Sequence, residues 1–223
     1  MSGVIDKVLN YRSIYRETRI SKSYNGELHA KMVVVIATSI MLLSLIGLEQ
    51  PTVWQLMTIP VTFFYANVIE YAAHRWVMHR RISWLSLVFR RHTLQHHRFY
   101  TYNNMLLQEK RDLCATLFPL SLVLFFFIGF ALPGALVVNY LFGLNVACFF
   151  IFTASAYYLM YEVFHTLYHI DYQGWITRQS WFISMKQRHQ HHHDVRIMQH
   201  CNFNITFPIT DWIMGTLYRD ENH

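Results

Sequence analysis

Ten histidines stand in four short groups along this chain. In order, the groups are His74 and His79; His92, His96 and His97; His165 and His169; and His189, His192 and His193. Imidazole nitrogen binds iron, zinc, copper and nickel, whereas magnesium and calcium prefer oxygen ligands. One tetrahedral metal uses only four ligands. The set therefore predicts two metal ions, each held by four or five histidines.

The spacing inside the groups is close to that of a helix. Residues three or four positions apart share a helix face, and such pairs occur in the second, third and fourth groups. Each of these pairs can chelate one metal from one helix. The two histidines of the first group are five positions apart, so they splay further around a helix. They either bracket two ions or lie where a helix ends.

Three further side chains are candidates to orient the imidazoles: Glu70, Glu162 and Asn202. Glu70 precedes His74 by four residues, and Glu162 precedes His165 by three. Metal-bound imidazoles commonly donate their other N–H to a carboxylate. The alternative is that both glutamates mark a membrane boundary or pair with arginine. Asn202 begins the segment that follows the last histidine group.

Adventitious metal binding is the alternative reading of the histidines. A run such as His-Gln-His-His-His, residues 189–193, binds metal through its composition alone. That explanation covers the fourth group and not all four, since each group lies next to an apolar run. His191 and His200 have no assigned role at this stage: they ligate, form hydrogen bonds or do neither.

The elements that must position these groups are membrane helices. Hydrophobic residues form 53% of the 223 residues and charged residues 14%, whereas a soluble domain carries about a quarter charged residues. A bilayer core is crossed by about 17 to 25 helical residues. Uncharged runs predict four spans, near 32–48, 52–69, 113–132 and 135–161. Pro133-Gly134 is the predicted breakpoint between the last two spans.

The basic residues predict the orientation of these spans. All 19 Lys and Arg fall in the amino-terminal segment, the central loop and the carboxy-terminal segment, and none falls in the two outer turns. Basic loops face the cytosol, so both termini and all histidine groups are expected there. The net charge of +6 lies beside apolar spans, which favours contact with lipid and excludes nucleic acid as the expected partner.

The predicted fold is therefore all-α, an integral, multi-pass membrane bundle of four transmembrane helices with a cytosolic, histidine-rich di-metal cap. Residues 1–30 are expected to form a cytosolic amino-terminal segment. Residues 31–223 are expected to form a single membrane domain.

The ordered histidine groups resemble the boxes of the membrane fatty acid hydroxylase and sterol desaturase superfamily, closest to its fatty acid 2-hydroxylase-like members. The similar segments are Glu70–His79 for the first box, His92–His97 for HxxxHH, His165–His169 for HxxxH, His189–His193 for HxxHH, and Asn202–Thr216 for the tail. The resemblance covers residues 55 to 218. Asn204 stands where this tail usually has glycine, and asparagine tolerates the left-handed conformation better than most residues.

The resemblance implies an O₂-dependent oxidoreductase that holds two iron ions at the ten histidines. It implies hydroxylation of a C–H bond of a fatty acyl chain or related lipid at the cytosolic membrane face. Zinc is expected to replace iron in purified protein, because zinc binds such sites more tightly than Fe²⁺. No cytochrome b5 domain is recognised in the chain. Electrons are therefore expected from a separate donor of the cytochrome b5 or ferredoxin type.

Desaturation of an acyl or sterol lipid on the same centre is the close alternative. Many acyl desaturases use three boxes and eight histidines, whereas this chain has an additional HxxxH pair and a short gap from His169 to His189. Both features favour hydroxylation. A metal transporter needs ionisable ligands within its spans, and the predicted spans contain none. A zinc-dependent hydrolase needs a metal-bound water and a general base, and would leave many histidines unused.

Overall fold

The long apolar runs form the long helices of the structure, a computed structural model that describes residues 2–218. Over these residues the chain is helical and contains no strand. Three stretches are long and apolar enough to cross a membrane: α2 (Gly26–Ile46), the succession Lys110–Phe142, and α9 (Leu144–Tyr168). Large apolar side chains such as Ile46 and Tyr140 lie exposed on the outside of the bundle. Helices that are apolar all round are typical of a lipid environment.

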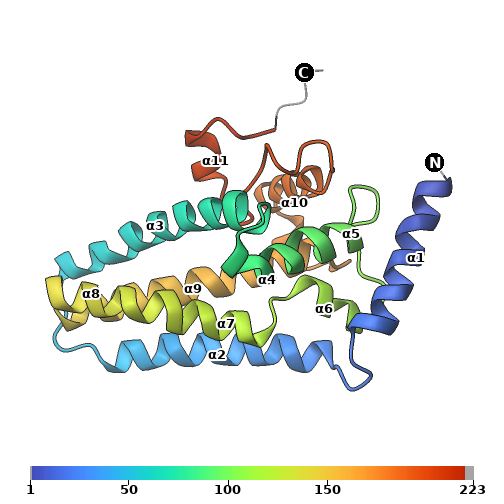
Figure 1. Cartoon of the computed structure of the whole chain (residues 1–223). Helices are drawn as coiled ribbons and strands as arrows, with labels where there is room; N and C mark the ends of the chain where they lie inside the picture. Colours follow the sequence, from blue (N-terminus) through green and yellow to red (C-terminus); the bar gives the residue numbers. More distant parts are fainter. Residues whose placement is uncertain (1, 219–223) are drawn as a thin grey trace.

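The predicted span 52–69 forms two consecutive helical elements. These are the 3₁₀ turn η1 (Val53–Met57) and α3 (Thr58–Ala72). With 15 residues, α3 alone falls short of the roughly 17 that cross a bilayer. Helix α3 packs against α9 and lies beside it in Figure 1. It continues directly into η2 (Ala73–Met78), which is π-helical.

The predicted breakpoint at Pro133-Gly134 is wrong. The elements in this region are α7 (Leu120–Phe126), the π-helical η6 (Phe127–Ala131) and α8 (Leu132–Phe142). They follow one helical path, and the chain reverses at Gly143 instead. The Leu132 N–H bonds to the Phe127 carbonyl five residues back. This wide π turn interrupts the usual hydrogen-bond ladder, so the helix passes Pro133, which has no N–H to donate.

Helix α9 is the centre of the bundle. It packs against α2, α3 and α8. Tyr158 of α9 joins Val33 and Ala37 of α2 and Val123 and Phe127 of the α7–η6 region in one buried apolar cluster. The small side chain of Ala37 is fully buried, which allows α2 to approach closely. The bundle thus holds the end of α9, where two histidines lie, in a fixed place.

Short helices gather at one end of the bundle and form a cap. They are η3 (Ser83–Leu85), α4 (Ser86–Phe89), the π-helical η4 (Arg90–His96), α5 (His97–Phe99), η5 (Lys110–Asp112), α6 (Leu113–Thr116), η7 (Ile176–Arg178), α10 (Ser180–His192) and α11 (Ile209–Ile213). Helix α1 (Ser2–Arg19) closes the outer side of the cap (Figure 1). The turns at α2–η1 and α8–α9 lie at the opposite end (Figure 1).

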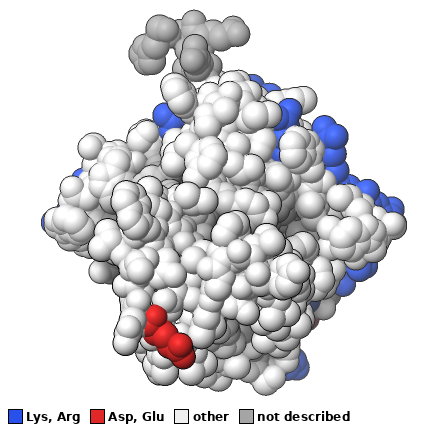
Figure 2. All heavy atoms as spheres, turned by 90° about the vertical axis from the view of Figure 1, so that its left-hand side faces the viewer, with Lys and Arg blue, Asp and Glu red and all other residues white. Residues whose placement is uncertain are grey.

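The two ends of the molecule differ in charge. Figure 2 looks onto the end that carries the two turns, where white atoms surround one red group and Lys and Arg appear only near the margin. Glu49 is exposed in the α2–η1 connection. The histidines therefore lie at the basic end of the bundle.

Gly143 is predicted to limit stability. Its φ of 87° with ψ of 171° lies in a region open essentially to glycine, where other residues cost about 1–3 kcal/mol. We expect Gly143→Ala to lower the free energy of unfolding by that amount, measured by denaturant titration in detergent. Gly129→Ala is the matched control, because a Cβ there meets Phe125 atoms at an ordinary 3.5 Å. Equal stability of the two variants would contradict this account of the turn.

Candidate metal centre

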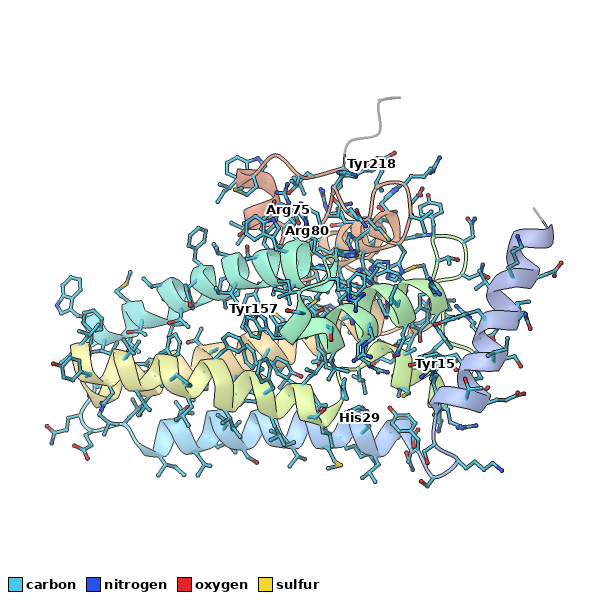
Figure 3. The ribbon with its side chains drawn as sticks, viewed as in Figure 1. Tyr15, His29, Arg75, Arg80, Tyr157 and Tyr218 are labelled. Carbon is cyan, nitrogen blue, oxygen red and sulfur yellow. The ribbon has the colours of Figure 1, made fainter. Side chains whose placement is uncertain are left out.

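All ten histidines of the four sequence groups meet inside the cap, and none is more than 3% exposed. Figure 3 shows nitrogen atoms gathered where the cap meets the end of α9. Nine of them form two clusters. Within each cluster, the potential ligand atoms all lie within 4.8 Å of one another. The α3 cluster contains His74, His79, His92, His97 and His192, and the α9 cluster contains His96, His165, His169 and His189. His193 Nε2 lies 3.1 Å from His189 Nε2, so we count His193 with the α9 cluster.

The clusters cut across the sequence groups, which corrects the expected pairing. His92 and His96 are four residues apart, yet they belong to different clusters. The reason is that η4 is π-helical. A π-helix bonds residues five positions apart and so brings them onto one face. His92 and His97 accordingly pair, with 3.1 Å between their Nε2 atoms.

The same π geometry pairs the first sequence group. His74 is the second residue of η2 and His79 follows its last residue, and their rings stack with centroids 5.0 Å apart. They therefore serve one cluster and do not bracket two ions. In α10, His189 and His192 are also divided between the clusters. The expected pairing of His165 with His169 on one helix is the arrangement found.

Backbone carbonyls hold the far side of five imidazoles. The Nδ1-to-carbonyl pairs are His74 to Phe203, His96 to Ala115 (2.9 Å), His169 to Met105 (2.8 Å), His192 to Cys201 (2.9 Å) and His193 to Tyr100 (2.8 Å). A carbonyl oxygen only accepts, so each of these Nδ1 atoms carries its hydrogen. Each Nε2 is then an unprotonated lone pair that faces the cluster. This is the state in which imidazole binds a metal.

The protonation of His79 and His192, and the distance between their Nε2 atoms, indicate whether the site fits a cation. The Thr93 hydroxyl donates to the Met78 carbonyl at 2.6 Å and accepts from His79 Nδ1 at 3.3 Å. His79 Nε2 is therefore unprotonated, as is His192 Nε2, and the two lie 2.9 Å apart. Two lone pairs at this distance repel unless a cation lies between them.

The spacing of the Nε2 atoms also matches metal coordination. The Nε2 contacts within the clusters measure 2.8 to 3.3 Å. Metal–nitrogen bonds of about 2.1 Å place neighbouring ligand nitrogens about 3.0 Å apart in octahedral and about 3.4 Å apart in tetrahedral coordination. The Nδ1 atoms of His97, His165 and His189 are buried without a partner in the described part of the chain. A bound metal at Nε2 would set the tautomer of these three rings.

Burial keeps the imidazoles neutral. Loss of hydration lowers the pKa of His79 to about 2, of His96 to about 3 and of His192 to about 4. Neighbouring imidazoles lower the pKa of His79 and His96 further, because a second positive charge in the cluster is repelled. Metal binding requires neutral imidazole, so protons compete weakly for these sites at neutral pH.

The expected contact of Glu70 with an imidazole is wrong. Its carboxylate accepts hydrogen bonds from Ile205 N (2.6 Å), Thr206 N (3.0 Å), Thr206 Oγ1 (2.7 Å), Asn204 Nδ2 (3.2 Å) and Tyr157 Oη (2.5 Å). Side chains on a helix lean toward its amino terminus, so Glu70 points away from His74 and toward the crossing tail. Tyr157 reaches the same carboxylate from α9 (Figure 3).

The Glu70 carboxylate nevertheless acts on the α3 cluster through the tail. The segment 204–206 that it holds continues directly from Phe203 and Cys201. The carbonyls of these two residues accept from His74 and His192. Glu70 thus anchors the backbone that orients two imidazoles.

Glu162 and Asn202 also differ from their expected roles. Glu162 Oε1 accepts from Tyr158 Oη at 2.7 Å, one turn toward the amino terminus, and Oε2 is buried. Asn202 adopts a left-handed φ of 59°. Its side chain donates to the Arg188 carbonyl and accepts from the Tyr218 N–H. These contacts close the tail onto α10, and neither residue bonds to an imidazole.

The remaining histidines of this region lie outside the clusters. His191 is half-buried and packs against the rings of Tyr102 and Tyr218, and His200 is exposed. Asn204 has no positive φ, so the left-handed backbone that its position suggested is absent there. Its amide instead donates to the Asn67 carbonyl at 3.0 Å and accepts from the Asp211 N–H.

Comparison with known proteins matches most of the chain to one protein family. Residues 59–216 match the family described as Fatty acid hydroxylase. No curated protein and no solved structure gives a significant match. The matched region contains all ten clustered histidines, Glu70 and the tail that Glu70 holds.

Acid is predicted to destabilise the metal-free protein. Because the folded-state pKa of His79, His96 and His192 is lowered, the unfolded chain takes up protons first as pH falls below about 6.5. Each such group costs up to about 1.4 kcal/mol per pH unit in that window. We expect the unfolding midpoint of chelator-treated protein to drop between pH 7.5 and pH 5. His200→Ala should keep the same slope, and a flat profile would contradict the neutral clusters.

Removal of the Glu70 carboxylate is predicted to loosen the tail. In Glu70→Ala, at least two buried donors lose their acceptor, and each loss costs about 1–3 kcal/mol. We expect the free energy of unfolding to fall by about 3 kcal/mol or more, with weaker metal retention. Glu17→Ala, at an exposed site, is the control and should behave as wild type. Wild-type stability of Glu70→Ala would show that the tail is held by other contacts.

Proposed function

The chain belongs to the fatty acid hydroxylase family, and on this basis we propose that it is an O₂-dependent di-iron oxidoreductase that hydroxylates a C–H bond of a fatty acyl chain or related lipid. One observation carries the proposal: two buried sets of unprotonated imidazole nitrogens converge beside apolar helices. One iron ion is assigned to each cluster. In this proposal the ten clustered histidines are the ligands of the two iron ions.

When bound, the two irons supply the redox chemistry that places one atom of O₂ in a C–H bond, while the other atom leaves as water with two electrons and two protons from outside. The chain's own groups hold this centre and exclude solvent. The five backbone carbonyls keep the Nδ1 protons in place, so the Nε2 lone pairs point inward. Imidazole ligands are not oxidised as readily as thiolates, and no cysteine belongs to either cluster.

An apolar groove supports a lipid as the substrate. It measures about 520 Å³ and is lined by Phe63 of α3, Phe207, Pro208, Ile209 and Trp212. Trp212 is 69% exposed, as is typical of tryptophan at a membrane interface.

The groove and the α3 cluster share one segment of chain. Four residues before Phe207, the ring of Phe203 packs against His74, His79 and His192, with centroids 5.9 to 6.4 Å apart. An alkyl chain in the groove therefore lies beside the segment that reaches the cluster.

The membrane arrangement of the proposal has four spans. Elements η1 and α3 together cover Val53–Ala72 and reach about 32 Å at 2.0 and 1.5 Å per residue, close to the roughly 30 Å of a bilayer core. The basic end with the histidines and both termini is placed in the cytosol, and the charge asymmetry in Figure 2 supports this orientation. In this proposal residues 1–30, which include the first turn of α2, form a cytosolic segment, and residues 31–223 form the membrane domain.

A separate redox protein, of the cytochrome b5 or ferredoxin type, is proposed as the electron donor. Arg80 and Arg81 are exposed and follow His79 directly, and Arg80 lies on the cap (Figure 3). Complementary charge speeds association, so an acidic donor surface suits this position. Electrons would then enter close to the α3 cluster.

Desaturation on the same clusters is the second candidate, since both reactions begin by removing a hydrogen from an alkyl chain. Zinc-dependent hydrolysis is less well supported. It needs a general base near the metal-bound water, whereas Glu70 faces the tail and Glu162 faces Tyr158.

Lipid mass spectrometry tests the proposal. One host should express the chain, His192→Ala or the control His200→Ala, each with an electron donor. We expect lipids heavier by one oxygen with the chain and with His200→Ala, and none with His192→Ala, because His192 belongs to the α3 cluster.

A lipid lighter by two hydrogens would make the chain a desaturase. The same products from His192→Ala would contradict the assignment of the centre. No new lipid from iron-loaded wild type, in a host rich in varied lipids, would count against lipid oxidation.

A further inference from the structure

Helix α1 carries a buried arginine that lies outside the region matched to the family. The match begins at residue 59, whereas Arg12 lies near the middle of α1. Only 2% of Arg12 is exposed, which is unusual for a permanently charged side chain. Its guanidinium lies 4.9 Å from the centroid of the Phe99 ring. Burial of this charge costs free energy unless hydrogen-bond acceptors surround the guanidinium.

The partners of Arg12 are three backbone carbonyls in one loop of the cap. Arg12 Nε donates to Phe99 O (2.7 Å), Nη2 to Asn104 O (2.6 Å) and Nη1 to Leu106 O (3.0 Å). Three donors in one rigid plane fix the relative positions of these carbonyls. Arg12 therefore sets the conformation of the loop from residue 99 to residue 106.

The same loop holds two histidines of the α9 cluster. The carbonyl of Tyr100, next to Phe99, accepts from His193 Nδ1 at 2.8 Å. The carbonyl of Met105, between Asn104 and Leu106, accepts from His169 Nδ1 at 2.8 Å. Carbonyls bound to Arg12 thus alternate with carbonyls bound to imidazole.

Neighbouring contacts keep α1 in register on the cap. Arg16 makes two hydrogen bonds of 2.8 Å with the buried carboxylate of Asp112. The Tyr15 hydroxyl lies 3.2 Å from Gln95 Oε1. Gln95 precedes His96, another member of the α9 cluster. The face of α1 that carries Arg12, Tyr15 and Arg16 therefore packs against the elements that carry the α9 cluster.

We propose that Arg12 is a positioning residue for the α9 metal site: by fixing the loop 99–106 it holds the two carbonyls that orient His169 and His193. The proposal rests on the proposed metal centre. In the α3 cluster, His74 and His192 use the carbonyls of Phe203 and Cys201 in the tail, which do not contact Arg12. Of the carbonyls that orient imidazoles, those held through Arg12 therefore serve the α9 cluster alone.

Metal release measures this specificity directly. The full-length protein in detergent is loaded with Zn²⁺, and the release of zinc to an excess of a chromogenic chelator is followed in wild type, Arg12→Lys and Arg12→Gln. Removing groups that orient metal ligands costs about 10- to 100-fold in affinity. We expect one of the two zinc ions to leave faster by that factor and the other to leave at the wild-type rate. Arg19→Ala, at an exposed site on the same helix, is the control and should release both ions as wild type does.

Single-site backgrounds identify the affected ion. His165→Ala removes a ligand of the α9 cluster and His79→Ala a ligand of the α3 cluster. Arg12→Lys should have no effect on the zinc that remains in His165→Ala, and should accelerate release from His79→Ala. Release of both ions at the wild-type rate, or equal acceleration of both, would overturn the role of Arg12. Wild-type protein that retains no zinc would instead count against the proposed metal centre.

Discussion

The hydrogen bond from imidazole Nδ1 to a backbone carbonyl is the interaction on which the site depends. It recurs at five of the ten histidines, on carbonyls from the tail, from the loop 99–106 and from Ala115. Each bond fixes both the tautomer and the direction of a ring. The result is two buried clusters of converging lone pairs, which repel one another without a cation.

Two parts of the chain, far apart in sequence, supply that support. The carboxy-terminal tail crosses α3 and is held by Glu70, and it serves the α3 cluster. Helix α1 crosses the opposite side of the cap and, through Arg12, serves the α9 cluster. The rigid end of α9 lies between them and contributes His165 and His169. Each histidine cluster therefore has its own support, and the bundle supplies a common base.

The sequence could predict the helical class and the gathering of the ten histidines, because apolar runs and histidine spacing are visible in residue types. It could not predict which histidines share a cluster, since the π turns η2 and η4 change the helical period without an evident residue signal. Pro133-Gly134 misled because a π turn carries the helix past the proline. Glu70 was named as a candidate, but its true partners lie far away in the sequence, and no local spacing indicates them. Arg12 was missed because its partners are backbone carbonyls that are also distant in sequence.

Iron binding through Nε2, with one ion in each cluster, is tested most directly by a crystal structure of the iron-loaded protein with anomalous data at the iron edge. The account predicts two anomalous peaks, one among His74, His79, His92, His97 and His192 and the other among His96, His165, His169, His189 and His193. Each iron should be bonded to Nε2 while Nδ1 keeps its carbonyl. A single peak, or iron bonded through Nδ1 after loss of the carbonyl contacts, would contradict it.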